Sequence, residues 1–169
     1  LAIGRTGRLN RFMQEFAEVV RLPAPSRRPS DLRGLLEDTV VLLREQASDR
    51  GIEWRWEIEA ELPPIALDPA QMEQVFLNVL KNALEAVGER GTIKLRLGLD
   101  RDRPFAAILD NGGGIPDEVR PHLFTPFFTS KRHGQGIGLT MVQEILVAHG
   151  CEFSLESTGD GWTEFRIRF

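Results

Sequence analysis

Two asparagines lie four residues apart in a segment whose apolar spacing predicts a long helix. Asn78 and Asn82 are followed by Glu85 about one turn later, and this spacing places the three side chains on one helix face. Asparagine is a poor helix former, so two on one face indicate a function. Their uncharged amide oxygens can ligate Mg²⁺ beside phosphate groups that supply the negative charge. The alternative is a plain hydrogen-bonding role at a helix surface.

A glycine-rich segment, Asp110-Asn111-Gly112-Gly113-Gly114-Ile115, directly follows a predicted strand. A carboxylate at a strand end can accept a hydrogen bond from an exocyclic amine, and the glycines let the chain approach a flat ring. This pattern suits a nucleobase. The alternative is a simple turn, because Asp-Asn-Gly also favours turns.

A loop with closely spaced aromatic residues comes next, and it contains Phe124, Phe127 and Phe128 before Lys131. The three rings can plug the core of this domain or form a docking patch for another, and the sequence leaves both open. Lys131 offers a mobile positive charge for a phosphate.

The fourth cluster is Gly134-Gln135-Gly136-Ile137-Gly138-Leu139 at the start of a predicted helix. Exposed backbone N–H groups at the positive end of a helix dipole bind anions. The sequence has no GxxxxGK[ST] loop, and Leu139 occupies the place of the third glycine of GxGxxG. Dinucleotide binding is therefore disfavoured, and phosphate binding is favoured.

The remaining sequence supplies elements that can position these clusters. Apolar residues at helical spacing and alternating strand patterns predict an α+β fold in two layers, with helices on one side of a mixed, mostly antiparallel sheet. The predicted helices are residues 1–21, 31–49, 68–87 and 137–148. The predicted strands are residues 53–59, 65–67, 92–99, 105–109, 153–155 and 163–169. Residues 110–138 are predicted to be mostly loop, and the proline-rich residues 23–30 a linker.

Composition limits the function further. The 169 residues carry a net charge of -4, which gives no support for a nucleic-acid partner. A solvated helix face explains the arginines of the N-terminal fifth better than a binding patch does. A single cysteine, Cys151, favours a core role in a reducing compartment, so we expect a cytoplasmic domain. No apolar run approaches the ~20 residues of a membrane span. The sequence begins within a helical pattern, so we expect a piece of a longer protein, which can be membrane-anchored.

The four clusters, in this order, resemble the N, G1, F and G2 boxes of sensor histidine kinases. These kinases belong to a wider ATPase family that includes gyrase B, the Hsp90 chaperones and the MutL proteins. Residues 1–22 resemble the end of the dimerisation and histidine-phosphotransfer helix, residues 23–30 a linker, and residues 31–169 the ATP-binding catalytic domain. The resemblance implies a Bergerat-type two-layer α/β sandwich.

The resemblance also implies roles for individual residues. Asn82 looks like the Mg²⁺ ligand, Asp110 like the acceptor for the adenine amine, and Thr163 like a threonine beside adenine. Residues 115–134 correspond to the lid over ATP. The implied ATP-binding residues are Asn78, Asn82, Glu85, Asp110, Gly112, Gly114, Ile115, Lys131, Gly134, Gly136, Ile137, Gly138, Leu139 and Thr163. The implied catalytic residues are Asn78, Asn82 and Lys131. Cys151 and Trp162 depart from the family, which often has glycine at both places.

Kinase activity is favoured over hydrolysis by one position. ATP-hydrolysing relatives place a glutamate base four residues before the Mg²⁺-binding asparagine, and here that residue is Asn78, which cannot abstract a proton at neutral pH. His122, His133 and His149 are interpreted as structural or surface residues, so the acceptor histidine is expected upstream of Leu1.

The expected partners follow from this assignment. They are ATP or ADP, an acceptor-histidine helix of the same protein in cis or trans, a response-regulator receiver domain, and a second copy in a homodimer. Two alternatives remain: a nucleotide-binding regulatory module that transfers nothing, and a serine-kinase anti-sigma factor.

Overall fold

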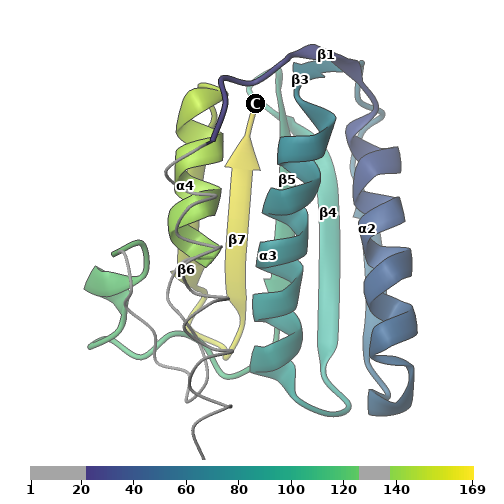
Figure 1. Ribbon diagram of the computed structural model, residues 1–169. Helices are drawn as coiled ribbons and strands as arrows, with labels where there is room; N and C mark the ends of the chain where they lie inside the picture. The colour runs from purple at the N-terminus through teal and green to yellow at the C-terminus, as the bar shows by residue number, and fades with distance from the viewer. Residues whose placement is uncertain (1–21, 126–137) are drawn as a thin grey trace, which may run out of the picture.

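The computed structural model describes residues 22–125 and 138–169, which form a sheet with helices packed on one face (Figure 1). Its strands, in spatial order, are β2 (Glu53–Ile58), β4 (Thr92–Asp100), β5 (Arg103–Asp110), β7 (Thr163–Arg168) and β6 (Glu152–Ser157). The helices are α2 (Leu32–Gln46), α3 (Pro69–Val87) and α4 (Gly138–Ala148). Only β2 and β4 are parallel within this sheet. The predicted α+β architecture is confirmed.

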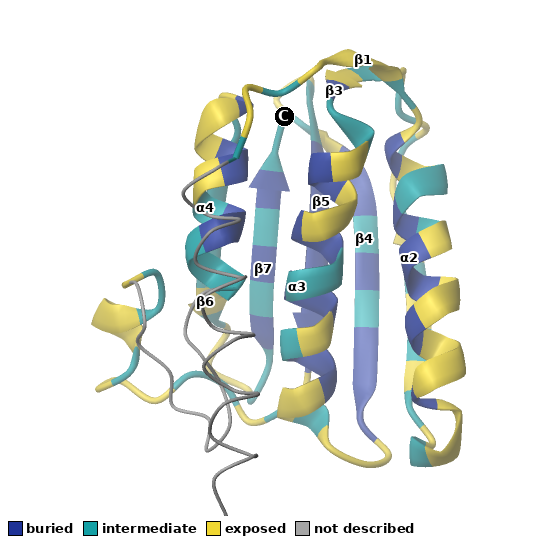
Figure 2. Ribbon diagram, viewed as in Figure 1, coloured by how far each residue is buried: buried dark blue, intermediate teal, exposed yellow. Residues whose placement is uncertain are grey.

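Helix α3 has the start and end that its sequence predicts. Its first turn follows Asp68, whose carboxylate accepts a hydrogen bond from the Gln71 N–H at 3.2 Å. Proline at the first helical position costs no helical hydrogen bond, because an N–H group there would have no intrahelical partner. The buried stripe of α3 faces the sheet (Figure 2). Its members are Met72, Val75, Phe76, Val79, Leu80, Ala83 and Leu84.

Helix α2 is shorter than predicted. It ends at Gln46 and is followed by a 3₁₀ turn, Ser48–Arg50. This turn brings the Arg50 guanidinium to the end of α3, where it donates hydrogen bonds to the carbonyl oxygens of Leu84 and Gly88. The last carbonyls of a helix lack intrahelical partners. Ending α2 early therefore supplies a cap for α3.

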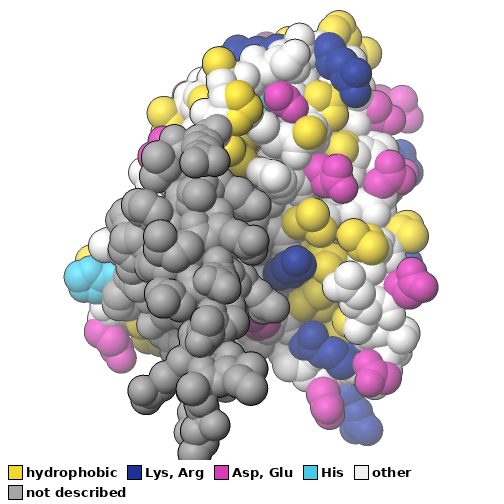
Figure 3. Space-filling model, viewed as in Figure 1, with side chains coloured by type: hydrophobic (Ala, Val, Ile, Leu, Met, Phe, Trp, Pro, Cys, Tyr) yellow, Lys and Arg dark blue, Asp and Glu magenta, His cyan; other side chains and the backbone are white. Residues whose placement is uncertain are grey.

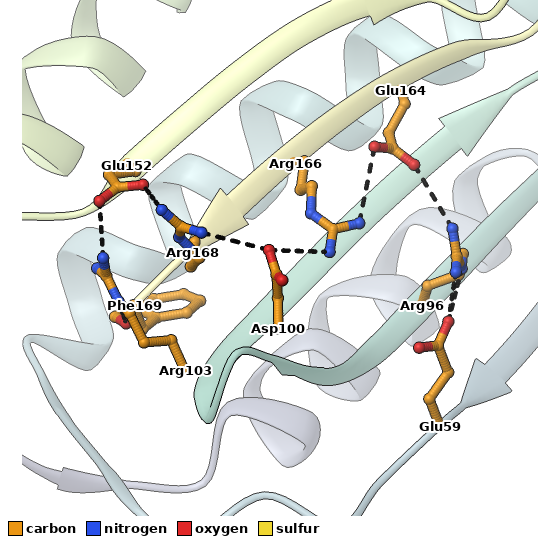
Figure 4. A network of polar contacts seen from close by, with 9 residues as sticks. All are labelled: Glu59, Arg96, Asp100, Arg103, Glu152, Glu164, Arg166, Arg168 and Phe169. Carbon is orange, nitrogen blue, oxygen red and sulfur yellow. Dashed lines mark hydrogen bonds and ion pairs between the residues drawn. The ribbon is translucent and has the colours of Figure 1, made fainter.

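The strands alternate between the helix-covered face and an outer face. On β4, Ile93, Leu95 and Leu97 are buried beneath the helices, whereas Lys94 and Arg96 point outward, as the period of two requires. Figure 4 shows that charged residues form a network across the outer face. Its members are Glu59, Arg96, Asp100, Arg103, Glu152, Glu164, Arg166 and Arg168, with the Phe169 carbonyl.

A small apolar cluster lies within that outer face. Phe105, Ala107 and Leu109 are buried, and Trp162 packs against them. The Arg166 guanidinium lies 3.9 Å from the Phe105 ring centre, a geometry that favours a cation–π contact. Trp162 is one of the two departures from the family pattern. It packs on the outer face of the sheet and does not enter the helix-covered core.

The predicted linker contains a strand that the sequence did not indicate. Residues Arg28–Ser30 form β1, which pairs antiparallel with β3 (Ile65–Leu67). A proline is tolerated here because β1 is an edge strand. Residues 22–27 are also bonded to the domain: the Gln71 side chain donates to the Pro23 carbonyl at 2.9 Å, and Arg27 donates to the Ala148 carbonyl at 2.8 Å. The segment predicted to be a linker is thus attached to both α3 and α4.

The strands at residues 53–59, 65–67, 92–99, 105–109, 153–155 and 163–169 are confirmed, with ends shifted by up to two residues. As far as residue 125, the loop after β5 contains one 3₁₀ turn, Arg120–His122. The predicted helix at residues 1–21 lies outside the described residues. Within the described part of the chain, no helix is long and apolar enough to cross a membrane.

Surface charges on the helix-covered side are mixed in sign. Figure 3 shows basic and acidic side chains interspersed over the described part of this face. In that view the described surface presents no continuous basic stripe of the kind that binds a phosphate backbone.

Candidate functional site

Within the described part of the chain, the elements that carry the predicted site residues meet at one edge of the sheet. The end of β5, the start of β7, the second half of α3 and the start of α4 all lie at the same end of the molecule, opposite the linker (Figure 1). Asp110 and Thr163 are direct partners in the antiparallel register of β5 and β7. Their relative exposures are 7% and 8%, so both side chains belong to the buried floor of this edge.

The Asp110 carboxylate is buried and accepts a hydrogen bond from one nearby backbone N–H group. Its Oδ1 accepts a hydrogen bond from the Gly112 N–H at 3.0 Å. Burial raises the pKa of Asp110, and the hydrogen bond from Gly112 offsets part of that rise. A buried carboxylate with remaining acceptor capacity is a recognition group for an N–H donor.

Asn111 anchors the glycine segment to the neighbouring strand. Its side-chain Oδ1 accepts the Thr92 N–H at 2.8 Å, and its own N–H lies 3.3 Å from the Thr92 carbonyl. The sequence indicated only that Asn111 suits a turn. Its partner is 19 residues away, and no local pattern points to it.

The glycines that follow approach α3 and the β6–β7 loop closely. A methyl group at Gly112 would lie 2.6 Å from the Ala86 carbonyl carbon. Gly113 and Gly114 have φ of 97° and 85°, a left-handed backbone that favours glycine. The Gly113 N–H donates to the Gly161 carbonyl at 3.0 Å, and the Ile115 N–H donates to Ser157 Oγ at 2.6 Å. Neither Ser157 nor Gly161 is among the site residues predicted from the sequence.

Asn78 of helix α3 lies close to the start of α4. Asn78 Nδ2 donates to the Gln74 carbonyl at 2.9 Å, and a methyl group at Gly138 would lie 2.8 Å from Asn78 Oδ1. Gly138, in the described part of the fourth cluster, therefore lies close to Asn78 of the first, although 60 residues separate the two in the sequence. Asn82 is half-buried and Glu85 is exposed on successive turns of the same helix.

The glycine cluster before α4 is only partly described. Gly138 begins the helix, and Leu139 is half-buried and packs against the core. Lys131, Gly134, Gly136 and Ile137, which the sequence predicts as phosphate-binding residues, lie outside the described residues. Their roles remain predictions.

In the described part of the aromatic loop, Phe124 packs against the core. Phe124 contacts Phe153 edge-on, with ring centres 5.5 Å apart, and Phe153 lies 6.4 Å from Phe165. For Phe124 this contact favours the plug over the docking patch. Phe127 and Phe128 lie outside the described residues.

The structure accounts for two of the chain's other reactive groups. His149 is buried, and both of its ring nitrogens are bonded, one to the Asp68 N–H and the other to the Ile145 carbonyl. Burial raises the pKa of Cys151 to about 11, which leaves little thiolate at neutral pH. His122 is exposed, and His133 lies outside the described residues.

The donor chemistry at this edge suits a cation that already carries phosphate. Among the described residues, no group of three or more His, Cys, Asp or Glu side chains could hold a metal ion. Amide oxygens of Asn78 and Asn82 are neutral, so they fit Mg²⁺ only when an anionic ligand balances the charge. Nucleotide phosphates would do so.

Comparison with known proteins gives one family. Residues 67–169 match the family described as histidine kinase-, DNA gyrase B-, and HSP90-like ATPase. The chain is similar to the sensor histidine kinase ZraS of Escherichia coli strain K12, with 34% identity over 143 residues. That match covers 85% of this chain and 31% of ZraS. The chain thus spans about a third of the length of this relative.

Solved structures agree in fold. The catalytic domain of histidine kinase ThkA is similar with a TM-score of 0.78 and 28% identity, covering 85% of this chain and 95% of that one. Full-length ShkA in complex with AMPPNP is similar with a TM-score of 0.83 and 26% identity, covering 97% and 36%. ThkA in complex with the response regulator protein TrrA has a TM-score of 0.80 and 26% identity, covering 98% and 48%.

Proposed function

The chain belongs to the histidine kinase-, DNA gyrase B- and HSP90-like ATPase family and is an ATP-binding catalytic domain of the sensor histidine kinase type, and from this premise we propose how it acts. ATP with Mg²⁺ binds at the edge formed by Asp110, Thr163, α3 and the start of α4. The γ-phosphate passes to a histidine on a helix of the intact protein, and from there to an aspartate of a response-regulator receiver domain. The juxtaposition of Asn78 and Gly138 is the observation that carries the proposal, because it joins the amide and glycine clusters at one place.

Base recognition is assigned to the sheet edge. The buried Asp110 carboxylate accepts a hydrogen bond from the exocyclic amine of adenine. Thr163, which pairs with Asp110 in the strand register, lies beside the adenine ring. Gly112 and Gly114 carry no side chain, so the segment can pass close to Ala86 and Ser157 and shape the pocket wall beside Asp110. A base with a carbonyl in place of that amine would meet two facing acceptors, so adenine is preferred over guanine.

Phosphate and metal binding are assigned to the two helices. Asn82 would ligate Mg²⁺ with its amide oxygen, and Asn78 and Glu85 lie on the same face of α3. When bound, the ion would neutralise charge on the transferring phosphoryl group. Gly138, at the start of α4, offers a backbone N–H at the positive end of the helix dipole. Lys131, Gly134 and Gly136 are proposed to complete the phosphate contacts.

Transfer is proposed in place of hydrolysis. Asn78 stands where hydrolysing relatives have a glutamate base, and its Nδ2 is engaged with the Gln74 carbonyl. An amide cannot take a proton from water at neutral pH. His149 is an unsuitable acceptor because it is buried and bonded at both ring nitrogens. The acceptor is therefore proposed to be a histidine outside this sequence, reached in cis or in trans within a homodimer.

The test is phosphotransfer to an added partner. The chain is mixed with Mg²⁺ and ATP labelled at the γ-phosphate, together with a kinase-dead, full-length homologous protein that retains its acceptor histidine. We expect an acid-labile, base-stable label on the partner and none with Asn82→Ala. Label on His122, His133 or His149 would contradict the assignment. ATP binding with no transfer would favour a regulatory module, and label on a partner serine would favour an anti-sigma kinase.

A further inference from the structure

Three polar side chains form a row across neighbouring strands at the candidate site. Asp110 ends β5, Thr163 begins β7 and Ser157 ends β6, and the register pairs Asp110 with Thr163 and Thr163 with Ser157. On β6, Ser157 shares a face with Phe153 and Leu155, which pack against the helix-covered core. Ser157 therefore lies on the same face of the sheet as the Asp110 carboxylate.

Ser157 holds the first residue after the three glycines. Its Oγ accepts a hydrogen bond from the Ile115 N–H at 2.6 Å, across 42 residues of sequence. A methyl group at Gly114 would lie 3.1 Å from that oxygen. Gly114 therefore passes close to the Ser157 hydroxyl, and the absence of a side chain at Gly114 permits this approach.

The same hairpin makes a second contact with the glycine segment. The Gly113 N–H donates to the Gly161 carbonyl at 3.0 Å, and the loop carrying Gly161 is closed by a 2.9 Å hydrogen bond from the Thr158 N–H to the Trp162 carbonyl. At the other end of the segment, Asn111 is bonded to Thr92. The glycines therefore run between two fixed points, one on β4 and one on the β6–β7 hairpin.

We propose that Ser157 is a positioning residue for nucleotide binding: by holding the Ile115 N–H, it fixes the path of residues 112–114 beside Asp110. This inference rests on the proposed function. Consecutive glycines have no side chains to define their path and lose more conformational entropy on ordering than other residues. Ser157 orders the glycines before the nucleotide binds, so the entropy cost of ordering them does not weaken binding. No contact between Ser157 and the nucleotide is required.

The experiment compares three variants of the full chain. Ser157→Ala removes the acceptor oxygen, Ser157→Thr retains it, and Ser154→Ala removes a hydroxyl from the opposite face of the same strand. The dissociation constant for ATP with Mg²⁺ is measured calorimetrically at a temperature where all variants are folded. We expect Ser157→Ala to weaken binding about 3- to 10-fold, the range for loss of one hydrogen bond. Ser157→Thr and Ser154→Ala should stay within about twofold of the original chain.

A second measurement separates positioning from a general loss of stability. In nucleotide-free protein, amide hydrogen exchange at Ile115 and Gly113 should be faster in Ser157→Ala, while exchange at Leu95 in the core is unchanged. Unchanged ATP affinity in Ser157→Ala would overturn the inference, as would equal losses in Ser157→Ala and Ser157→Thr. Weaker binding with unchanged exchange at Ile115 would also overturn it. Failure of the original chain to bind ATP would instead refute the proposed function, and this inference with it.

Discussion

His149 Nε2 accepts a hydrogen bond from the Asp68 N–H at 3.0 Å, joining the end of α4 to the start of α3 across 81 residues of sequence. Its Nδ1 lies 2.8 Å from the Ile145 carbonyl oxygen, a geometry that suits the tautomer with the hydrogen on Nδ1. Around this pair, Ser26 and Arg27 of the linker are bonded to Asp68 and Ala148. The linker is therefore held at one end of α3 and α4, and the candidate site lies at the other.

His149→Ala should lower the free energy of unfolding by about 1–3 kcal/mol, because it leaves the Asp68 N–H without its partner in a partly buried place. Denaturant unfolding followed by circular dichroism measures this change. Val147→Ala is the matched control, since Val147 is 62% exposed on the same helix and should change stability by less than about 0.5 kcal/mol. Equal effects of the two substitutions would refute the role given to His149.

Asp68→Ala should cost about 0.5–2 kcal/mol at pH 7 through loss of the N-cap of α3. Burial raises the pKa of Asp68. Hydrogen bonds from the backbone N–H groups of Ser26, Gln71 and Ala70 together outweigh this effect, so the pKa lies below its ordinary value. A lowered folded-state pKa gives stability that is present above the ordinary pKa and is lost as pH falls through the folded value. The difference between the two proteins should thus shrink below about pH 4. Asp68→Ser, which retains a capping oxygen, should lose less at pH 7.

Asp110→Asn should weaken ATP binding by about 10- to 100-fold, since it replaces a charged acceptor with a neutral one. The stability of the nucleotide-free protein, in contrast, should not fall. Because burial raises the pKa of Asp110, its contribution to stability is present at low pH and lost as pH rises through the folded value. The variant should therefore be at least as stable as the original chain at pH 7, with the two converging below about pH 4. Thermal unfolding with and without ATP tests both; a variant that is less stable yet binds ATP normally would contradict them.

Two glycine-to-alanine substitutions at the site should differ in cost. Gly112→Ala would place a methyl group 2.6 Å from backbone atoms of Ala86. Only a movement of α3 or of the strand end relieves this clash, so we expect a loss of about 1–3 kcal/mol in the free energy of unfolding. Gly138→Ala would meet the Asn78 side-chain oxygen at 2.8 Å, and a rotation of that side chain relieves the contact. We expect less than about 1 kcal/mol for Gly138→Ala by denaturant unfolding. The reverse order would show that the close approach of Gly112 to α3 is wrong.

Cys151 should react slowly with alkylating reagents. Burial raises its pKa to about 11 from 9.0, despite opposing effects of Arg27 and Arg103. Two pKa units correspond to about 100-fold less thiolate at pH 8. Labelling with iodoacetamide at pH 8 should thus be at least about 100-fold slower in the folded chain than in guanidinium chloride. Similar rates would contradict the burial of this thiol.

The sequence by itself determined most of the helices and strands and predicted which residues form the site. Helix α3 is predictable because its cap, its proline and its apolar stripe are all local signals, and the strands follow from alternation. Asp110, Thr163, Asn78 and Gly138 were identified from residue type, order and resemblance to a family. Local patterns of this kind need no knowledge of distant contacts.

Tertiary structure decided what holds these residues in place. The Ser157–Ile115, Asn111–Thr92 and Asp68–His149 bonds join residues 42, 19 and 81 positions apart, and nothing in the neighbourhood of either partner encodes the other. Strand β1 was missed for the same reason: a proline-containing segment has weak strand propensity, and only its pairing with β3 makes it a strand. Residue types set what this edge of the sheet can bind, whereas the folded chain alone brings a serine from β6 to the end of the glycine segment.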